Sequence, residues 1–214
     1  MSPAAPPQWS LAAVTEHLRA LHQASAQRQL IVFIGPPGAG KSTVVDQLAT
    51  SLGSTTAVVP MDGFHLDDQV LTALGRRQRK GAPDTFDVDG LATTLVRLRR
   101  DDGTVAIPVF DRALEIARAG ARLIGPQHRI LLVEGNYLLL DQPPWTTLAA
   151  HFDWRILVTA PEPVLRQRLL ERWQALPPAD AAAKVDGNDL PNAQLVLTGS
   201  AATDIVVDTS QGEV

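Results

Sequence analysis

Residues 35–42 have the types and the spacing that bind phosphate. They read Gly-Pro-Pro-Gly-Ala-Gly-Lys-Ser and match the phosphate-loop pattern G-x-x-x-x-G-K-[ST] at every fixed position. Glycines let the backbone curl so that its N–H groups face an anion, Lys41 can reach the β and γ phosphates, and Ser42 can hold Mg²⁺. The alternative is a glycine-rich turn without a ligand. The predicted nucleotide-binding residues of this segment are Gly35, Pro37, Gly38, Ala39, Gly40, Lys41, Ser42 and Thr43.

The loop is flanked by the two elements that a phosphate loop needs. Residues 30–34 are a short apolar, β-rich run, which predicts a buried parallel strand, and residues 43–52 have a helical pattern. The N-terminus of that helix adds positive potential at the place where a phosphate would bind. This strand-loop-helix context favours nucleotide binding over a bare turn.

The remaining chain alternates between strands and helices. Strands are predicted at 57–60, 129–133, 154–159 and 204–207, and helices at 10–26, 66–74, 89–100 and 161–173. Together with 30–34 they predict an α/β chain of the P-loop NTPase fold: a doubly wound, five-stranded parallel sheet with right-handed crossovers, helices on both faces and a small helical lid. Residues 175–184 could be a helix or a mobile part of the lid, whose predicted range is 161–186.

Length and composition narrow the class of protein. The 214 residues suit one domain over 8–214, preceded by a loose Pro/Ala tail at 1–7. A net charge of -4 argues against general affinity for nucleic acid, and the absence of cysteine excludes disulfides and thiolate metal sites. Residues 1–7 lack a signal-peptide pattern, and no run approaches the roughly 20 apolar residues that cross a bilayer. We expect a cytoplasmic protein with no membrane partner.

Polar residues follow two of the predicted strands at the end where ligands collect in such sheets. Asp62 and His65 come directly after 57–60, and Glu134 comes directly after 129–133. An acid there can hold Mg²⁺ or accept the proton of an alcohol that attacks the γ-phosphate. We predict Asp62 as the base and, with Ser42 and Glu134, as a metal-side residue. Asp62 could instead be a helix cap, Glu134 could form a structural ion pair, and His65 could contact substrate or only pack.

Missing motifs separate the classes of nucleotide-binding protein. The chain has no Asn-Lys-x-Asp for guanine recognition and no Leu-Ser-Gly-Gly-Gln, and its second acidic strand ends in Val-Glu-Gly rather than Asp-Glu. A small-molecule kinase fits best, because such enzymes need an acceptor pocket with an acid and cations that close over the phosphates. The rival hypothesis is a regulatory or accessory ATPase without a small-molecule acceptor.

Four further segments carry a resemblance. Residues 61–65 read Met-Asp-Gly-Phe-His, 79–87 read Arg-Lys-Gly-Ala-Pro-Asp-Thr-Phe-Asp, 111–112 read Asp-Arg, and 133–140 read Val-Glu-Gly-Asn-Tyr-Leu-Leu-Leu. With these segments the chain resembles the phosphoribulokinase/uridine kinase family of phosphate-loop kinases, which includes bacterial pantothenate kinase. It is most similar to short bacterial nucleoside-kinase-like and fructose-transport-associated, fructokinase-like kinases.

The resemblance implies roles for particular residues. It implies ATP and Mg²⁺ as ligands, Asp62 at the catalytic position, and Arg168 and Arg172 as lid arginines that reach the phosphates, Arg168 together with Lys41 stabilising the transferring phosphoryl group. A solvated helix face is the alternative for the two arginines. Residues 188–193 could lie beside the adenine, although Asn192 could instead cap a helix. The implied acceptor pocket consists of His65, Lys80, Asp84, Phe86, Arg112, Asn136 and Tyr137.

The acceptor itself stays open. The pyrimidine-binding text of uridine kinases and the extra substrate helices of pantothenate kinase are not visible in this chain. A polar pocket around His65, Lys80 and Arg112 could hold a sugar through its hydroxyls or a sugar phosphate through its cations, and a nucleoside remains a candidate. Trp9, Trp145 and Trp154 could serve the core or the interface of a homodimer.

Overall fold

A computed structural model describes residues 5–210 of the chain. Its central sheet is parallel and five-stranded, as predicted, in the order β2-β5-β1-β6-β7. Strand β1 lies in the middle and is buried from Leu30 onward, because its unbroken apolar run suits a strand covered on both faces. The strands are β1 Gln29–Ile34, β2 Thr56–Pro60, β5 Ile130–Glu134, β6 Trp154–Thr159 and β7 Ile205–Asp208.

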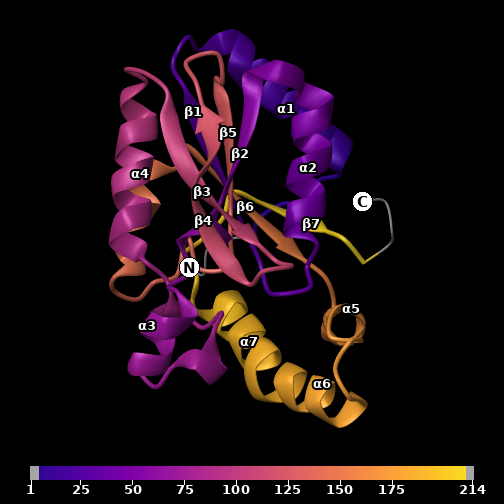
Figure 1. The fold of residues 1–214 in the computed structure, drawn as a ribbon. Helices are drawn as coiled ribbons and strands as arrows, with labels where there is room; N and C mark the ends of the chain where they lie inside the picture. The colour runs from indigo at the N-terminus through magenta and orange to yellow at the C-terminus, as the bar shows by residue number, and fades with distance from the viewer. Residues whose placement is uncertain (1–4, 211–214) are drawn as a thin grey trace.

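Helices cover both faces of this sheet, which confirms the doubly wound prediction (Figure 1). Side chains of β1 alternate between the faces. Ile31 and Phe33 belong to the core cluster with α1 (Leu11–Ala24) and α2 (Lys41–Leu52). Leu30, Val32 and Ile34 belong to the other cluster, which includes α4 (Val88–Arg100) and the 3-10 helix η5 (Trp145–His151).

An antiparallel hairpin lies beside the sheet, where the sequence predicted no element. It consists of β3 (Val105–Asp111) and β4 (Ile116–Ile124). Strand β4 is exposed at every position except its last, and it is rich in alanine and arginine, so it lacks the apolar alternation that reveals a strand. The hairpin matters for the site because β3 carries Phe110 and the turn carries Arg112 and Glu115.

The remaining helices gather beyond one end of the sheet (Figure 1). The predicted lid corresponds to α5 (Glu162–Arg172) and α6 (Pro178–Lys184), and a π-helical turn, η6 (Val185–Asp189), connects α6 to α7 (Leu190–Gly199). The short helix α3 (Asp68–Ala73) also lies beyond this end of the sheet (Figure 1). The other 3-10 helices are η1 Gly53–Thr55, η2 Met61–Phe64, η3 Arg77–Arg79 and η4 Pro83–Thr85.

The N-terminal tail differs from the prediction of a loose segment. Residues 1–4 lie outside the described residues, but the Pro7 carbonyl accepts a hydrogen bond from the Val206 N–H at 2.9 Å, and Gln8 pairs with β7. This part of the tail therefore binds the edge strand of the sheet. No helix within residues 5–210 is long and apolar enough to cross a membrane. Trp145 is a core residue, whereas Trp9 and Trp154 contact each other with ring centroids 5.4 Å apart.

Candidate active site

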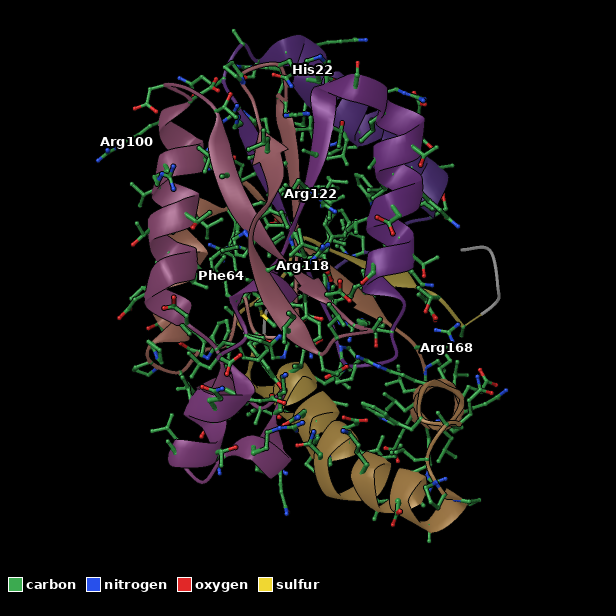
Figure 2. The ribbon with its side chains drawn as sticks, in the orientation of Figure 1. His22, Phe64, Arg100, Arg118, Arg122 and Arg168 are labelled. Carbon is green, nitrogen blue, oxygen red and sulfur yellow. The ribbon has the colours of Figure 1, made fainter. Side chains whose placement is uncertain are left out.

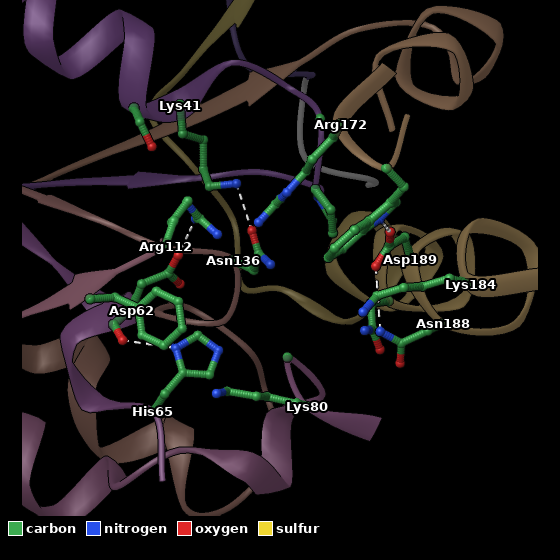
Figure 3. A pocket seen from close by; sticks show the side chains of 18 of the residues that line it. Lys41, Asp62, His65, Lys80, Arg112, Asn136, Arg172, Lys184, Asn188 and Asp189 are labelled. Carbon is green, nitrogen blue, oxygen red and sulfur yellow. Dashed lines mark hydrogen bonds and ion pairs between the residues drawn. The ribbon is translucent and has the colours of Figure 1, made fainter. Parts of the chain in front are cut away.

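A cavity of about 430 Å³ opens at the carboxyl ends of β1, β2 and β5, the edge predicted from the fold (Figure 3). It is lined by the phosphate loop, the β3–β4 turn, η3 and the lid helices. Its size suits a small-molecule site. The charged groups around it include Lys41, Asp62, Lys80, Arg112, Glu134 and Arg172.

The phosphate loop has the backbone that its glycines allow. Gly38 and Gly40 both have φ of +81°, a left-handed conformation that is costly for any residue with a β-carbon. Gly35 allows a close approach, because a β-carbon there would lie 2.0 Å from the Val158 carbonyl oxygen. Helix α2 begins at Lys41, so its N-terminus faces the cavity. Six of the residues predicted to bind nucleotide line this cavity: Pro37, Gly38, Gly40, Lys41, Ser42 and Thr43.

Lys41 is held in a buried position by three hydrogen bonds. Its Nζ donates hydrogen bonds to the Gly35 carbonyl at 3.0 Å, the Pro36 carbonyl at 3.1 Å and Asn136 Oδ1 at 2.6 Å. Burial lowers the pKa of Lys41 to about 8, although the negative charges of Glu134 and Asp62 act in the opposite direction. Asn136, predicted to bind the acceptor, lines the cavity, and its side-chain oxygen accepts the hydrogen bond from Lys41.

The two predicted acids lie in the same cavity with different surroundings. Glu134 is buried, and its burial together with the negative charge of Asp62 raises its pKa to about 7, with Lys41 acting in the opposite direction. Asp62 is more accessible, and its Oδ2 accepts a hydrogen bond from the Arg112 guanidinium at 2.6 Å. The two acids therefore differ in exposure and in partner, although the charges of both act on Lys41.

These residues fit a magnesium ion that is shared with nucleotide phosphates. Residues 5–210 contain no group of three His, Asp or Glu side chains able to hold a metal alone. Ser42, Asp62 and Glu134 nevertheless all line the cavity, and the repulsion between the two carboxylates is what a divalent cation would relieve. Mg²⁺ usually binds through one or two carboxylates plus substrate phosphates, which matches this donor set.

Aromatic rings and a lysine form the opposite end. The His65 ring lies between Phe86 and Phe110, with centroid distances of 4.1 Å and 4.7 Å, and its Nδ1 is 2.8 Å from the Asp62 carbonyl oxygen. Burial lowers the pKa of His65. Lys80 Nζ contacts Asp68 Oδ1 and the Glu115 carbonyl, each at 2.7 Å, and lies 5.1 Å from the Phe110 ring centroid.

Arg172 is the lid arginine that lines the cavity (Figure 3). Its side chain is partly exposed to solvent, but partial burial in the cavity and the positive charge of Arg112 lower the pKa of Arg172. Two like charges that face one space are stabilised when an anion enters between them. Arg172 and Arg112 are therefore suited to the transferring phosphoryl group.

Three side chains that were predicted as site residues do not line the cavity. Arg168 shares a helix face with Arg172, but α5 passes close to Gly38, so Arg168 donates to the Gly38 carbonyl and to Thr209 instead of lining the cavity. Asp84 pairs with Arg76 at 2.6 Å outside the cavity. The buried Tyr137 hydroxyl donates to the Gly81 carbonyl at 2.7 Å, beneath the pocket. Of the loop residues, Gly35 and Ala39 support the backbone rather than line the cavity.

Several lining residues were missed by the sequence analysis. Asn192 lines the cavity together with Asn188 and Asp189 of the same predicted segment, and Trp173 Nε1 donates to Asp189 Oδ2 at 2.7 Å. A tryptophan directly after a predicted lid arginine was a usable signal, whereas the exposed hairpin gave none. The missed lining residues are Arg77, Gln78, Gly81, Phe110, Glu115, Gly135, Trp173 and Lys184.

Known proteins resemble this chain over most of its length. No family model matches it. The uncharacterized protein YggC of Escherichia coli is 36% identical over 203 residues, which cover 91% of this chain and 84% of YggC. A protein of Schizosaccharomyces pombe named "Putative uridine kinase" is 34% identical over 196 residues, covering 85% and 83% of the two chains.

A solved structure agrees with the sequence relatives. The crystal structure of a "putative fructose transport system kinase" from Silicibacter sp. TM1040 superposes with a TM-score of 0.84 at 41% sequence identity, covering 92% of this chain and 98% of the other. The family suggested by residues 61–65 and 133–140 is thus confirmed. The chain belongs to the uridine kinase-like family of phosphate-loop kinases.

Proposed function

We propose that the protein transfers the γ-phosphoryl group of ATP to a hydroxyl of a small metabolite, such as a sugar or a nucleoside. The observation that carries this proposal is the position of Asp62, which shares a cavity with Lys41 and is held by Arg112 at 2.6 Å. The printed names of the relatives mention uridine kinase and a fructose transport system kinase, which supports a small-molecule acceptor without selecting one.

In the proposed reaction Asp62 accepts the proton of the acceptor hydroxyl. The hydroxyl oxygen then forms a bond to the γ-phosphorus, the bond from that phosphorus to the β–γ bridging oxygen breaks, and ADP leaves. Lys41 and Arg172 stabilise the negative charge of the transferring group, Arg172 taking the role first expected of Arg168. Catalysis of this kind is mostly positioning and charge stabilisation, which the fixed positions of Lys41 and Asp62 would supply.

Mg²⁺ would neutralise charge on the β and γ phosphates when it is bound with the nucleotide. Ser42, Glu134 and Asp62 are the residues proposed to hold it. The acceptor would contact His65, Lys80 and Phe86, with Phe110 added from the hairpin. Because Lys80 is already paired with Asp68, a neutral polyol needs fewer rearrangements there than a second phosphate does.

A screen for acceptor-dependent ADP release tests the proposal. The purified protein is incubated with MgATP and pools of sugars, nucleosides and vitamins, and products are searched by mass spectrometry for a gain of one phosphoryl group. We expect one pool to stimulate ADP release in the wild type but not in the Lys41→Met variant. Hydrolysis of ATP at the same rate with and without every pool would contradict the proposal and favour the accessory ATPase.

A further inference from the structure

Arg168 and Thr209 connect the lid helix, the end of the sheet and the phosphate loop. Thr209 directly follows β7 and is 1% exposed. Its backbone N–H donates to the Thr159 carbonyl at 2.9 Å, so it continues the pairing of β7 with β6. Arg168 Nη2 donates to the Thr209 carbonyl at 2.7 Å, and Arg168 Nη1 donates to Thr209 Oγ1 at 2.9 Å. Figure 2 shows Arg168 where α5 approaches the end of β7.

The hydroxyl of Thr209 also forms a hydrogen bond with the phosphate loop. Because Oγ1 accepts from Arg168, its own hydrogen is free for a carbonyl, and the Ala39 carbonyl oxygen at 2.9 Å is closer than the Thr159 carbonyl oxygen at 3.3 Å. Arg168 Nη1 also lies 3.3 Å from the Gly38 carbonyl oxygen. The Gly38 and Ala39 carbonyls are therefore held by side chains of α5 and of the residue that follows β7.

Holding the Ala39 carbonyl fixes the next amide. In a planar trans peptide the C=O and the following N–H point in opposite directions. The Ala39 carbonyl points to Thr209, so the Gly40 N–H points the other way, and Gly40 lines the cavity. Gly40 alone would not hold this orientation, since glycine is the residue with the widest choice of backbone conformations.

We propose that Arg168 and Thr209 are positioning residues, which together fix the Ala39–Gly40 peptide so that its N–H faces a nucleotide phosphate. The inference rests on the proposed function, because it needs a nucleotide at the loop. It replaces the direct contact between Arg168 and phosphate that the family resemblance implied. Arg172 alone of the two arginines then acts from within the cavity.

The test compares Thr209→Val with Thr209→Ser. Valine keeps the shape but leaves the Ala39 carbonyl and an Arg168 N–H without a partner, whereas serine keeps the hydroxyl. Binding of fluorescent ADP is measured below the melting temperature of every variant, followed by the KM for ATP. We expect T209V to weaken ADP binding and to raise the KM for ATP by about tenfold each, with the KM for the acceptor unchanged, and T209S to restore both.

A double-mutant comparison adds a second, independent readout. Arg168→Gln should weaken ADP binding as T209V does, and the double variant should bind no more weakly than either single variant, because all three break one chain of contacts. Arg166→Gln is the control, since Arg166 lies on the same helix but pairs with Asp186 on the outside. Wild-type affinity in T209V combined with a loss in R168Q would overturn the inference in favour of direct phosphate contact. Failure of the wild type to bind ADP would overturn the proposed function as well.

Discussion

The two ends of the cavity are built in different ways. At the nucleotide end, backbone groups of one continuous loop surround a single side chain, Lys41, which bonds to the carbonyls of Gly35 and Pro36. At the acceptor end, side chains from separate segments meet in pairs, as Asp62 does with Arg112 and Lys80 with Asp68. A backbone site can be shared by a whole family, whereas a site made of side chains changes with each substitution.

This difference predicts how the two ends respond to mutation. Changes at the nucleotide end should impair nucleotide binding and turnover together, because one loop serves both. Changes at the acceptor end should alter turnover or the KM for the acceptor while nucleotide binding stays intact. Variants at both ends therefore separate the donor half from the acceptor half.

The largest combined effect on turnover and nucleotide binding is expected at the nucleotide end, from Lys41→Met. Turnover should fall on the order of 10³-fold and nucleotide affinity should fall with it, because the only cation inside the loop is removed. Steady-state kinetics and ADP titration measure the two effects. An unchanged ADP affinity would show that the loop is not the phosphate site.

Arg112→Met is the corresponding change at the acceptor end. It removes the partner that orients Asp62 at 2.6 Å. We expect turnover to fall by about 10²-fold with the KM for ATP changed less than about threefold, because Arg112 holds Asp62 and faces the phosphoryl group in transfer, so its loss affects the transition state more than the bound nucleotide. A rise in the KM for ATP as large as the loss of turnover would place Arg112 at the nucleotide instead.

Glu134 lies between the two ends of the cavity. Its titration should make the free energy of unfolding of the nucleotide-free protein depend on pH. Its pKa is raised from 4.5 to about 7, so the folded protein keeps a proton that the unfolded chain has released. The free energy of unfolding contributed by this group is therefore fully present below pH 4.5 and is lost as the pH rises through 7. Relative to wild type, Glu134→Gln should gain on the order of 2 kcal/mol between pH 4.5 and pH 7.5.

Urea unfolding at several pH values measures this gain. Asp153→Asn, which changes a carboxylate far from the cavity that pairs with Arg99, is the control. Parallel pH profiles for E134Q and wild type would contradict the assignment of a strained carboxylate at this position.

The smallest effect is expected from Phe110→Leu at the acceptor end. The loss of the ring beside His65 should raise the KM for the acceptor about fivefold and leave ADP binding unchanged. Leu123→Ala on the same hairpin is the matched control, because Leu123 is 64% exposed and does not line the cavity. Equal effects of the two substitutions would mean that Phe110 acts only through the stability of the hairpin.

The nucleotide end could be predicted from the sequence because its signals are local. The apolar run at 30–34, the glycine spacing of 35–40 and the helix that begins at Lys41 are neighbours in the chain, and each is recognisable alone. Asp62 and Glu134 could be predicted as neighbours in space, because each follows a predicted parallel strand and the carboxyl ends of parallel strands meet at one edge of the sheet. The five strands and the family were recovered in this way.

The acceptor end depended on contacts that local patterns do not contain. Strand β4 is exposed, so nothing in its composition marks the hairpin that brings Phe110 to His65 and Arg112 to Asp62. Helical spacing showed that Arg168 and Arg172 share a face, but not that α5 passes so close to Gly38 that only Arg172 reaches the cavity. Asp84 similarly sits in a matching segment and yet turns to Arg76.

The central claim is that Asp62 acts on the acceptor while the loop holds the nucleotide. The most direct measurement compares turnover and ADP affinity in Asp62→Asn, an isosteric change that keeps a hydrogen-bond acceptor for Arg112 but removes the base. Turnover is expected to fall by about 10³-fold or more, with ADP affinity within about threefold of wild type. Full turnover in this variant would contradict the account.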